Sequence, residues 1–444
     1  MVRVVIVGGG GAGMSAASKA RRMRNDAEIM VFEAGGFVSY ASCGIPYYVE
    51  GLVNRHEELV TYSPAFFKKE RNIDVHVHAL VEDVDVSAKT ITYVEDSERI
   101  TVEWDKLIIA TGAEPVKPTI PNIEVNNIFT VKFIEDAMKI REATIHANNI
   151  VIVGGEYIGI EMAEAFRVLG KTVTMIEMLP HILPNLDFEI SEIIARKLAE
   201  NGVILRLEER VHEFIGDDAV ERVVTDKANY NVDLVVLAVG VRPNITLARK
   251  LGVQIGKTGA IDVEKTMETS LSDVYACGAC VETVHRVTGE KIWIPLAPAA
   301  NKMGYVAGNN VFEGHLEFPG VFGTAFTKTF DLHIAKTGLA EVEAKNKALK
   351  TASALITTRS RAQYYPQGQE MVLKVVVEKT SGKLLGAQCV GTEAVTGHIN
   401  AFAALLAANA NLEDLFFSDF GYAPPFAQVW DPLVIAARII GFGT

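Results

Sequence analysis

The feature that most constrains the fold is a pattern that occurs twice, in which a short apolar strand leads into a glycine-rich turn and then a helix. In the first copy, residues 4–7 read Val-Val-Ile-Val and residues 8–13 read Gly-Gly-Gly-Gly-Ala-Gly. Gly8, Gly10 and Gly13 match the spacing G-x-G-x-x-G, whose glycines allow a tight bend, close approach of a pyrophosphate and close helix packing. The pattern predicts a parallel α/β unit that binds a dinucleotide.

Residues 14–23 complete the helix of this unit, and residues 29–32 form its second apolar strand. The N-terminus of the helix, beside Ala12, would face the phosphates. Glu33 ends the second strand, twenty residues after Gly13, where a carboxylate can accept hydrogen bonds from ribose hydroxyls. Because strand, turn, helix and acid occur in order, we interpret this segment as a dinucleotide site rather than an incidental glycine turn.

The second copy departs from the pattern at one position. It consists of a strand over 150–153, the turn Gly-Gly-Glu-Tyr-Ile-Gly at 154–159, a helix over 160–169, a strand over 172–176 and then Glu177. Gly154 and Gly159 keep the outer glycines, but Glu156 replaces the middle one, where its carboxylate would crowd and repel a pyrophosphate. Glu177 favours an unphosphorylated ribose, and therefore NADH over NADPH, although both nucleotides stay open.

Length and composition exclude several classes of protein. A chain of 444 residues with 49% hydrophobic residues is too long for one core, so we expect two or three domains. A formal charge of -12 gives no basic stripe for nucleic acid. The chain enters its first strand without a secretory signal and has no apolar run of about 20 residues, so we expect a cytoplasmic protein without membrane association. Four scattered cysteines fit a reducing compartment.

One of these cysteines, Cys43, lies ten residues beyond Glu33 in the stretch Ser-Tyr-Ala-Ser-Cys-Gly-Ile-Pro at residues 39–46. A thiol beside a nucleotide site can exchange electrons with a flavin, and without a second cysteine nearby it must pair with something other than a neighbour in the chain. Residues 44–47 read as the opening of a helix whose dipole would stabilise a thiolate. The alternative is a buried structural cysteine.

Two other cysteines, Cys277 and Cys280, have the spacing of a redox C-x-x-C motif. A single pair does not complete a four-ligand zinc site, and we interpret the spacing as coincidental. The ten histidines form no H-x-x-x-H pair, so we expect no metal.

Three further landmarks follow in order: Ala110, Thr111 and Gly112 after a strand, the run at 238–244 that contains Gly240, and the run at 274–278 that ends at Gly278. Together with the two turns they resemble the pyridine nucleotide-disulfide oxidoreductase family over essentially the whole chain. The resemblance implies an α/β fold with two Rossmann-like domains, one for FAD and one for NAD(P)H, and a C-terminal α+β domain that makes a homodimer. It places the FAD domain at residues 1–112 and 245–323, the NAD(P)H domain at 113–244 and the dimerisation domain at 324–444.

The resemblance also implies that FAD is held by the first turn, by the segment 110–112 and by an aspartate after Gly278. Ala279 stands where that aspartate is expected. Loss of such a charge-assisted hydrogen bond would weaken flavin binding by about 1.5–3 kcal/mol.

Relatives of the glutathione and lipoamide reductase type carry two cysteines at the position of Cys43. A lone cysteine resembles the branch of coenzyme A-disulfide reductases, CoA-dependent sulfur reductases, and NADH oxidases and peroxidases. The peroxidase type has a histidine in the first turn, which is absent here. The stretches at 39–44, 364–366 and 421–425 resemble the CoA-disulfide reductases.

This resemblance carries over Tyr365 and Tyr422 as hydroxyls that assist the thiol from across the dimer, or that only pack at the interface. Arg22, from the basic cluster on the first helix, together with Ser39 and Ser42, would contact CoA, although such a cluster can equally be a solvated helix face.

The function that follows is hydride transfer from NAD(P)H to FAD and then reduction of a Cys43–CoA mixed disulfide, with CoA persulfide or polysulfide as a related substrate. A NADH oxidase that reduces oxygen to peroxide or water is the first alternative. A flavoprotein with impaired catalysis that serves as a binding partner is the second, encouraged by Glu156 and Ala279.

Overall fold

The computed structural model describes residues 1–441 and divides into two compact units. The first unit comprises residues 1–116, 132–138 and 241–321, and the second comprises residues 117–131, 139–240 and the chain from 322 onward. In the described part of the chain, no helix combines the length and the apolar character needed to cross a membrane.

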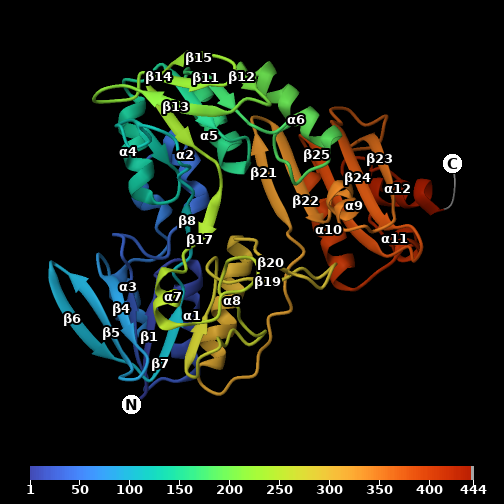
Figure 1. Ribbon diagram of the computed structural model, residues 1–444. Helices are drawn as coiled ribbons and strands as arrows, with labels where there is room; N and C mark the ends of the chain where they lie inside the picture. Colours follow the sequence, from blue (N-terminus) through green and yellow to red (C-terminus); the bar gives the residue numbers. More distant parts are fainter. Residues whose placement is uncertain (442–444) are drawn as a thin grey trace. The chain divides into compact units, whose positions relative to one another are not determined.

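The first unit is built on a parallel sheet of five strands. Its order is β18 (Val274–Ala276), β7 (Lys106–Ile109), β1 (Arg3–Val7), β2 (Glu28–Phe32) and β3 (Asp74–His76). Helix α1 (Gly11–Met23) packs against α8 (Ala297–Asn310), as Figure 1 shows. Glycines permit this contact, because a Cβ at Gly304 would lie 2.1 Å from the carbonyl oxygen of Ala12.

Smaller elements complete the first unit. An antiparallel sheet contains β4, β5 and β6, and two short pairs join β8 to β17 and β19 to β20. The bounds are β4 (Leu80–Asp85), β5 (Thr90–Glu95), β6 (Glu98–Glu103), β8 (Ala113–Pro115), β17 (Val241–Pro243), β19 (Thr283–Val284) and β20 (Lys291–Ile292). The remaining helices are η1 (Ser42–Gly44), α2 (Ile45–Glu50), η2 (His56–Leu59), α3 (Pro64–Arg71) and α7 (Thr246–Leu251), while α4 (Ile134–Thr144) has residues in both units.

The second unit repeats the parallel design. Its first sheet has the order β12 (Val203–Arg206), β11 (Thr172–Ile176), β10 (Asn149–Val153), β16 (Leu234–Leu237) and β9 (Ile128–Thr130). The accompanying helices are α5 (Tyr157–Val168) and α6 (Phe188–Glu200), and an antiparallel sheet holds β13 (Val211–Ile215), β14 (Arg222–Thr225) and β15 (Asn229–Asn231).

An antiparallel sheet dominates the C-terminal part of the second unit. Its order is β21 (Ala325–Thr329), β22 (Leu332–Gly338), β25 (Leu384–Gly391), β24 (Glu370–Glu378) and β23 (Thr351–Arg359). It is accompanied by α9 (Glu341–Asn346), α10 (Val395–Ala407), α11 (Leu412–Phe416) and α12 (Pro432–Gly441).

The observed sheets confirm the predicted fold class, while the predicted domain boundaries stay a prediction. Both helices at the glycine turns begin three residues earlier than the sequence suggested, at Gly11 rather than 14 and at Tyr157 rather than 160. The reason is that the last glycine of each turn, Gly13 or Gly159, already has helical backbone. Each helix therefore starts directly at the turn.

Candidate active site

The three glycines of the first turn have different physical roles. Gly8 has φ +111°, and a Cβ there would lie 2.2 Å from the carbonyl oxygen of Ala110. A Cβ at Gly13 would lie 1.9 Å from the carbonyl oxygen of Gly8. Around Gly10, by contrast, no atom lies within 4 Å of the position a Cβ would take. Gly8 and Gly13 are therefore needed for the turn itself, and Gly10 leaves open space beside the N-terminus of α1.

Glu33 fixes the turn from the end of β2. Its carboxylate accepts hydrogen bonds from the backbone N–H of Gly9, at 2.7 Å, and of Gly35, at 2.9 Å. The side chain is half-buried, and each carboxylate oxygen keeps a further acceptor position.

The segment after β7 lies against the same turn. The backbone N–H of Ala110 donates to Val7, and the hydroxyl of Thr111 donates to the carbonyl oxygen of Asn244 at 2.7 Å. The backbone N–H of Asn244 returns a bond of 3.0 Å to the carbonyl oxygen of Gly112. These two bonds connect the segment that follows β7 to the segment that follows β17.

The Gly278 segment also meets the first turn. Gly278 has φ +85°, and a Cβ there would lie 2.6 Å from the Cβ of Ala12. Ala279, half-buried, accepts a hydrogen bond of 2.8 Å at its carbonyl oxygen from the indole of Trp293. The structure therefore brings the three FAD landmarks of the sequence together, with a methyl group where the carboxylate was expected.

Cys43 is exposed and lies in the 3₁₀ turn η1, directly before α2. Its loop is attached to the first glycine turn, because the backbone N–H of Ser39 donates to the carbonyl oxygen of Gly9 at 2.9 Å. Ser39 itself has φ 51°, a left-handed conformation that is unfavourable for serine. The expected helix opening is confirmed, but α2 has only six residues and its dipole effect on the thiol is correspondingly small.

A lysine that sequence reasoning missed lies near enough to Cys43 for their charges to interact. Lys132 precedes α4, and the neighbouring Glu135 accepts a hydrogen bond of 3.0 Å from the backbone N–H of Gly36 in the loop that leads to Cys43. Burial lowers the pKa of Lys132, and the charge of Cys43 acts in the opposite direction. Nothing in the single sequence marks this lysine, because the contact joins segments far apart in the chain.

The other candidate thiols are inert by comparison. Cys277 and Cys280 are fully buried, and the thiol of Cys280 contacts the carbonyl oxygen of Cys277 at 3.3 Å. Burial raises the pKa of both. Among residues 1–441, no group of three or more His, Cys, Asp or Glu side chains is arranged to hold a metal ion.

The second turn reproduces the first almost contact for contact. Gly154 has φ +108°, and a Cβ there would lie 2.3 Å from the carbonyl oxygen of Ala238. A Cβ at Gly159 would lie 2.2 Å from the carbonyl oxygen of Gly154. Glu177 is buried and accepts hydrogen bonds from the backbone N–H of Gly155, at 2.7 Å, and of Leu179, at 2.8 Å. The turn therefore folds as a dinucleotide turn despite the substitution at its middle glycine. Gly240, with φ +95°, follows β16 at the same end of this sheet.

Glu156 occupies the position equivalent to Gly10. Its backbone is extended, with φ -88°, which any residue adopts, and its side chain is exposed and makes no capping hydrogen bond. Partial desolvation raises the pKa of Glu156, and the negative charge of Glu177 raises it further. The second turn therefore carries a carboxylate at the position where the first turn has only the hydrogen of Gly10.

Two of the C-terminal tyrosines are hydrogen-bonded to each other, and the proposed roles of Tyr365 and Tyr422 stay a prediction. The hydroxyls of Tyr364 and Tyr422 lie 3.1 Å apart, and both side chains are exposed. This hydrogen bond raises the pKa of Tyr422. Tyr365, which the sequence analysis selected, is half-buried beneath the guanidinium of Arg361, 6.0 Å from its ring centroid. These residues belong to the second unit and Cys43 to the first.

The basic cluster on α1 separates into two kinds of residue. Arg21 donates to the backbone carbonyl oxygens of Arg71, at 3.1 Å, and Asn72, at 2.7 Å, and is therefore structural. The ammonium of Lys19 lies 4.7 Å, and the guanidinium of Arg22 5.9 Å, from the ring centroid of Tyr305. Arg22 and Tyr305 are exposed, so this group offers a cationic surface with an aromatic platform. Ser39 and Ser42 are half-buried in the Cys43 loop.

Comparison with known proteins gives consistent matches along the chain. Residues 2–304 match the family described as pyridine nucleotide-disulphide oxidoreductase, and residues 324–433 match its dimerisation domain. A CoA-dependent NAD(P)H sulfur oxidoreductase of Pyrococcus abyssi is 48% identical over 99% of this chain and 98% of its own length. A NADH oxidase of Methanocaldococcus jannaschii is 37% identical over 98% of each chain. The solved structure of a NAD-dependent persulfide reductase from A. fulgidus is 40% identical, with a TM-score of 0.96 over 99% of this chain and 83% of that one.

Proposed function

This chain belongs to the pyridine nucleotide-disulphide oxidoreductase family, and on that premise we propose that it reduces disulfides or persulfides of coenzyme A with electrons from NAD(P)H. The observation that carries the proposal is the single exposed thiol of Cys43, on a loop that is hydrogen-bonded to the first glycine turn. The CoA-dependent name of the Pyrococcus relative supports it.

The first turn fits FAD by its own geometry. The space beside Gly10 admits a pyrophosphate, the N-terminus of α1 supplies free backbone N–H groups, and Glu33 keeps acceptor positions for a ribose. Ala279 is the one position that lacks the expected group. When bound, the flavin supplies the two-electron chemistry that links the nicotinamide nucleotide to the sulfur of Cys43.

Cys43 performs the thiol exchange. Its thiolate attacks one sulfur of CoA disulfide, so that a Cys43–CoA bond forms, the original S–S bond breaks and one CoA thiolate leaves. Two electrons and protons then cleave the mixed disulfide and regenerate the thiol, which gives two CoA thiols for each NAD(P)H. With CoA persulfide the thiolate attacks the outer sulfur, the S–S bond breaks and CoA thiolate leaves, and two electrons and protons then reduce the Cys43 persulfide to the thiol and hydrogen sulfide. Lys132 interacts electrostatically with Cys43 and would act as a cation beside the mixed disulfide.

Other groups serve the substrate and the dimer. The Tyr364–Tyr422 pair supplies phenol protons for the departing thiolate, donated from the partner protomer of a homodimer formed through residues 324–433. Lys19 and Arg22, beside Tyr305, bind the phosphates of CoA. The four free cysteines fit a reducing cytoplasm.

A NADH oxidase is the second candidate, favoured by the relative at 37% identity. In that reaction the oxidised form of Cys43 would be a sulfenic acid, and no disulfide substrate would be needed.

Anaerobic oxidation of NADH with CoA disulfide, in the presence of excess FAD, separates these functions. The expected result is two thiols released per NADH, with loss of turnover in Cys43→Ser. Oxidation of NADH in air without any disulfide, at an equal rate, would instead establish the oxidase. Flavin binding without turnover in either assay would favour a non-catalytic partner.

Matched variants of the tyrosines test the site further. Tyr364→Phe and Tyr422→Phe should each lower kcat for CoA disulfide about tenfold, whereas Tyr365→Phe should leave it unchanged. Equal effects of all three variants would contradict the assignment of the pair.

A further inference from the structure

The loop between β11 and α6, residues 177–187, is attached to the second glycine turn at three points. Gly155 donates to Glu177 and accepts at its carbonyl oxygen from the backbone N–H of Leu183 at 2.9 Å. The side-chain amide of Asn185 donates to the hydroxyl of Tyr157 at 3.2 Å. Tyr157 is the first residue of α5 and directly follows Glu156, the middle residue of the turn.

A lysine of the C-terminal sheet holds the far end of this loop. The ammonium of Lys336, on β22, donates to the backbone carbonyl oxygen of Asn185 at 2.8 Å and to Glu343 at 3.0 Å. Lys336 is only 5% exposed. A buried ammonium is unfavourable unless it is paired and hydrogen-bonded. The bonds to Asn185 and Glu343 are therefore needed to keep Lys336 buried at this position.

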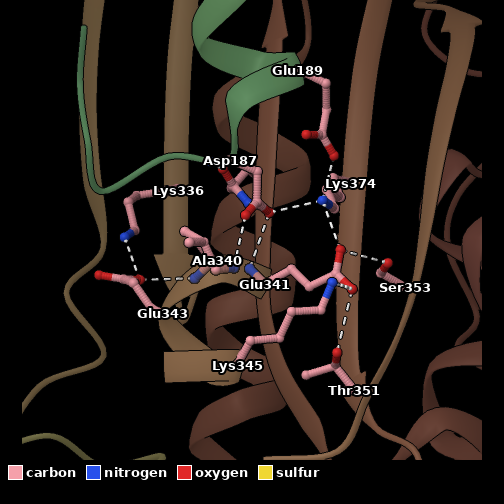
Figure 2. A network of polar contacts seen from close by, with 12 residues as sticks. Asp187, Glu189, Lys336, Ala340, Glu341, Glu343, Lys345, Thr351, Ser353 and Lys374 are labelled. Carbon is pink, nitrogen blue, oxygen red and sulfur yellow. Dashed lines mark hydrogen bonds and ion pairs between the residues drawn. The ribbon is translucent and has the colours of Figure 1, made fainter. Parts of the chain in front are cut away.

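A second set of polar contacts beside Lys336 connects the loop to the C-terminal sheet (Figure 2). Asp187 accepts hydrogen bonds from the backbone N–H of Glu341, at 3.0 Å, and of Val342, at 2.9 Å, and pairs with Lys374 at 3.0 Å. The amide of Gln388, fully buried, donates to Asp187 at 2.6 Å. Lys374 also contacts Glu341 at 2.9 Å. The loop is thus anchored to the C-terminal sheet immediately after Asn185.

We propose that Lys336 is a positioning residue for the nicotinamide-nucleotide site, which acts through Asn185 to hold the Tyr157 hydroxyl at the second glycine turn. This inference rests on the proposed function, in which that turn binds NAD(P)H. Three bonds in series connect the buried sheet to the turn: Glu343 to Lys336, Lys336 to Asn185 and Asn185 to Tyr157. A Tyr157 side chain released from this chain of bonds must be ordered again when the nucleotide binds, which weakens binding.

The test is nucleotide affinity measured apart from sulfur chemistry. The dissociation constant of NAD⁺ is measured by calorimetry, and KM and kcat for NADH are measured with an artificial electron acceptor. Lys336→Met and Asn185→Ala should each raise the dissociation constant and KM about three- to tenfold, the equivalent of one net hydrogen bond, with kcat changed less than about twofold.

Lys345→Met is the matched control. Lys345 pairs with Glu341 at 2.8 Å in the same network, not with Asn185. The Lys345→Met protein should therefore bind NAD⁺ as tightly as the wild type. Lys336→Arg should recover most of the affinity, because it restores a cation. Asn185→Ala keeps the buried ion pair, so it remains informative if Lys336→Met lowers the melting temperature.

A double-mutant cycle with Tyr157→Phe identifies the route. If Lys336 acts through the Tyr157 hydroxyl, Lys336→Met should add almost nothing to the affinity loss of Tyr157→Phe. Additive losses would show a merely structural lysine and overturn the inference, as would wild-type affinity in both Asn185→Ala and Lys336→Met. Failure of the wild-type protein to bind NAD⁺ or NADH at all would refute the proposed function itself, and the inference with it.

Discussion

Replacement of Glu156 should strengthen nucleotide binding at the second turn. Glu156 occupies the place where Gly10 of the first turn leaves open space, and its backbone does not require the side chain, since φ is -88° and no capping bond is made. Glu156→Gly should therefore fold normally, with a free energy of unfolding within about 0.5 kcal/mol of the wild type.

The size of the effect follows from the exposure of the side chain. A carboxylate about 6 Å from a phosphate charge repels it by about 1 kcal/mol when water screens the pair strongly. The exposed position of Glu156 places it in that regime. Removal of the charge should lower the dissociation constant of NAD⁺ about fivefold. Glu156→Gln keeps the volume and removes only the charge, so it separates repulsion from crowding.

The pH dependence provides the sharper assay. The pKa of Glu156 is raised by desolvation and by Glu177, so this carboxyl takes up a proton at a higher pH than an ordinary glutamate. As the pH falls through that pKa, the repulsion is lost and the wild-type affinity for NAD⁺ should rise, while Glu156→Gln and Glu156→Gly should show no such trend. Calorimetric titrations from pH 8 down to about pH 4, the ordinary range of a glutamate, measure this directly. Equal affinity and equal pH dependence in the wild type and Glu156→Gln would refute the electrostatic reasoning.

The remaining predictions concern the flavin site and acid stability. Ala279→Asp should strengthen FAD retention after gel filtration at least tenfold, from a bond of about 1.5–3 kcal/mol; unchanged flavin absorbance would contradict it. Gly13→Ala should lower the melting temperature, because its Cβ would lie 1.9 Å from a carbonyl oxygen, whereas Gly10→Ala should keep the melting temperature and lose FAD affinity. Burial alone would raise the pKa of Asp187, but its hydrogen bonds outweigh burial and lower the pKa. In the same way, hydrogen bonds and ion pairs with Lys345 and Lys374 outweigh burial and lower the pKa of Glu341 to about 2. Both folded pKa values lie below their unfolded values near 4, so the two ionised carboxylates stabilise the folded protein above pH 4 and this stabilisation is lost as the pH falls toward 2. Asp187→Asn should therefore reduce the fall in melting temperature between about pH 4 and pH 2.

The fold and the local structure around Cys43 could be predicted from the sequence because their signals are local. Each turn needs glycine where a Cβ would collide with a carbonyl oxygen, and it needs an acid that accepts hydrogen bonds from the turn. Both requirements appear as a fixed spacing within one βαβ unit. The opening of α2 after Cys43 is equally local, since Pro46 and the residues around it favour a helix start.

Only the tertiary structure decided which side chains meet across the chain. Lys132 interacts electrostatically with Cys43, and Lys336 donates to Asn185, between segments that are remote in sequence and that no periodicity connects. The hydroxyl of Tyr364 meets that of Tyr422, 58 residues further along the chain, a pairing that sequence spacing does not indicate. Spacing in the sequence determined the backbone frame of this protein, and packing of distant segments determined which charged and hydroxyl side chains lie beside its glycine turns.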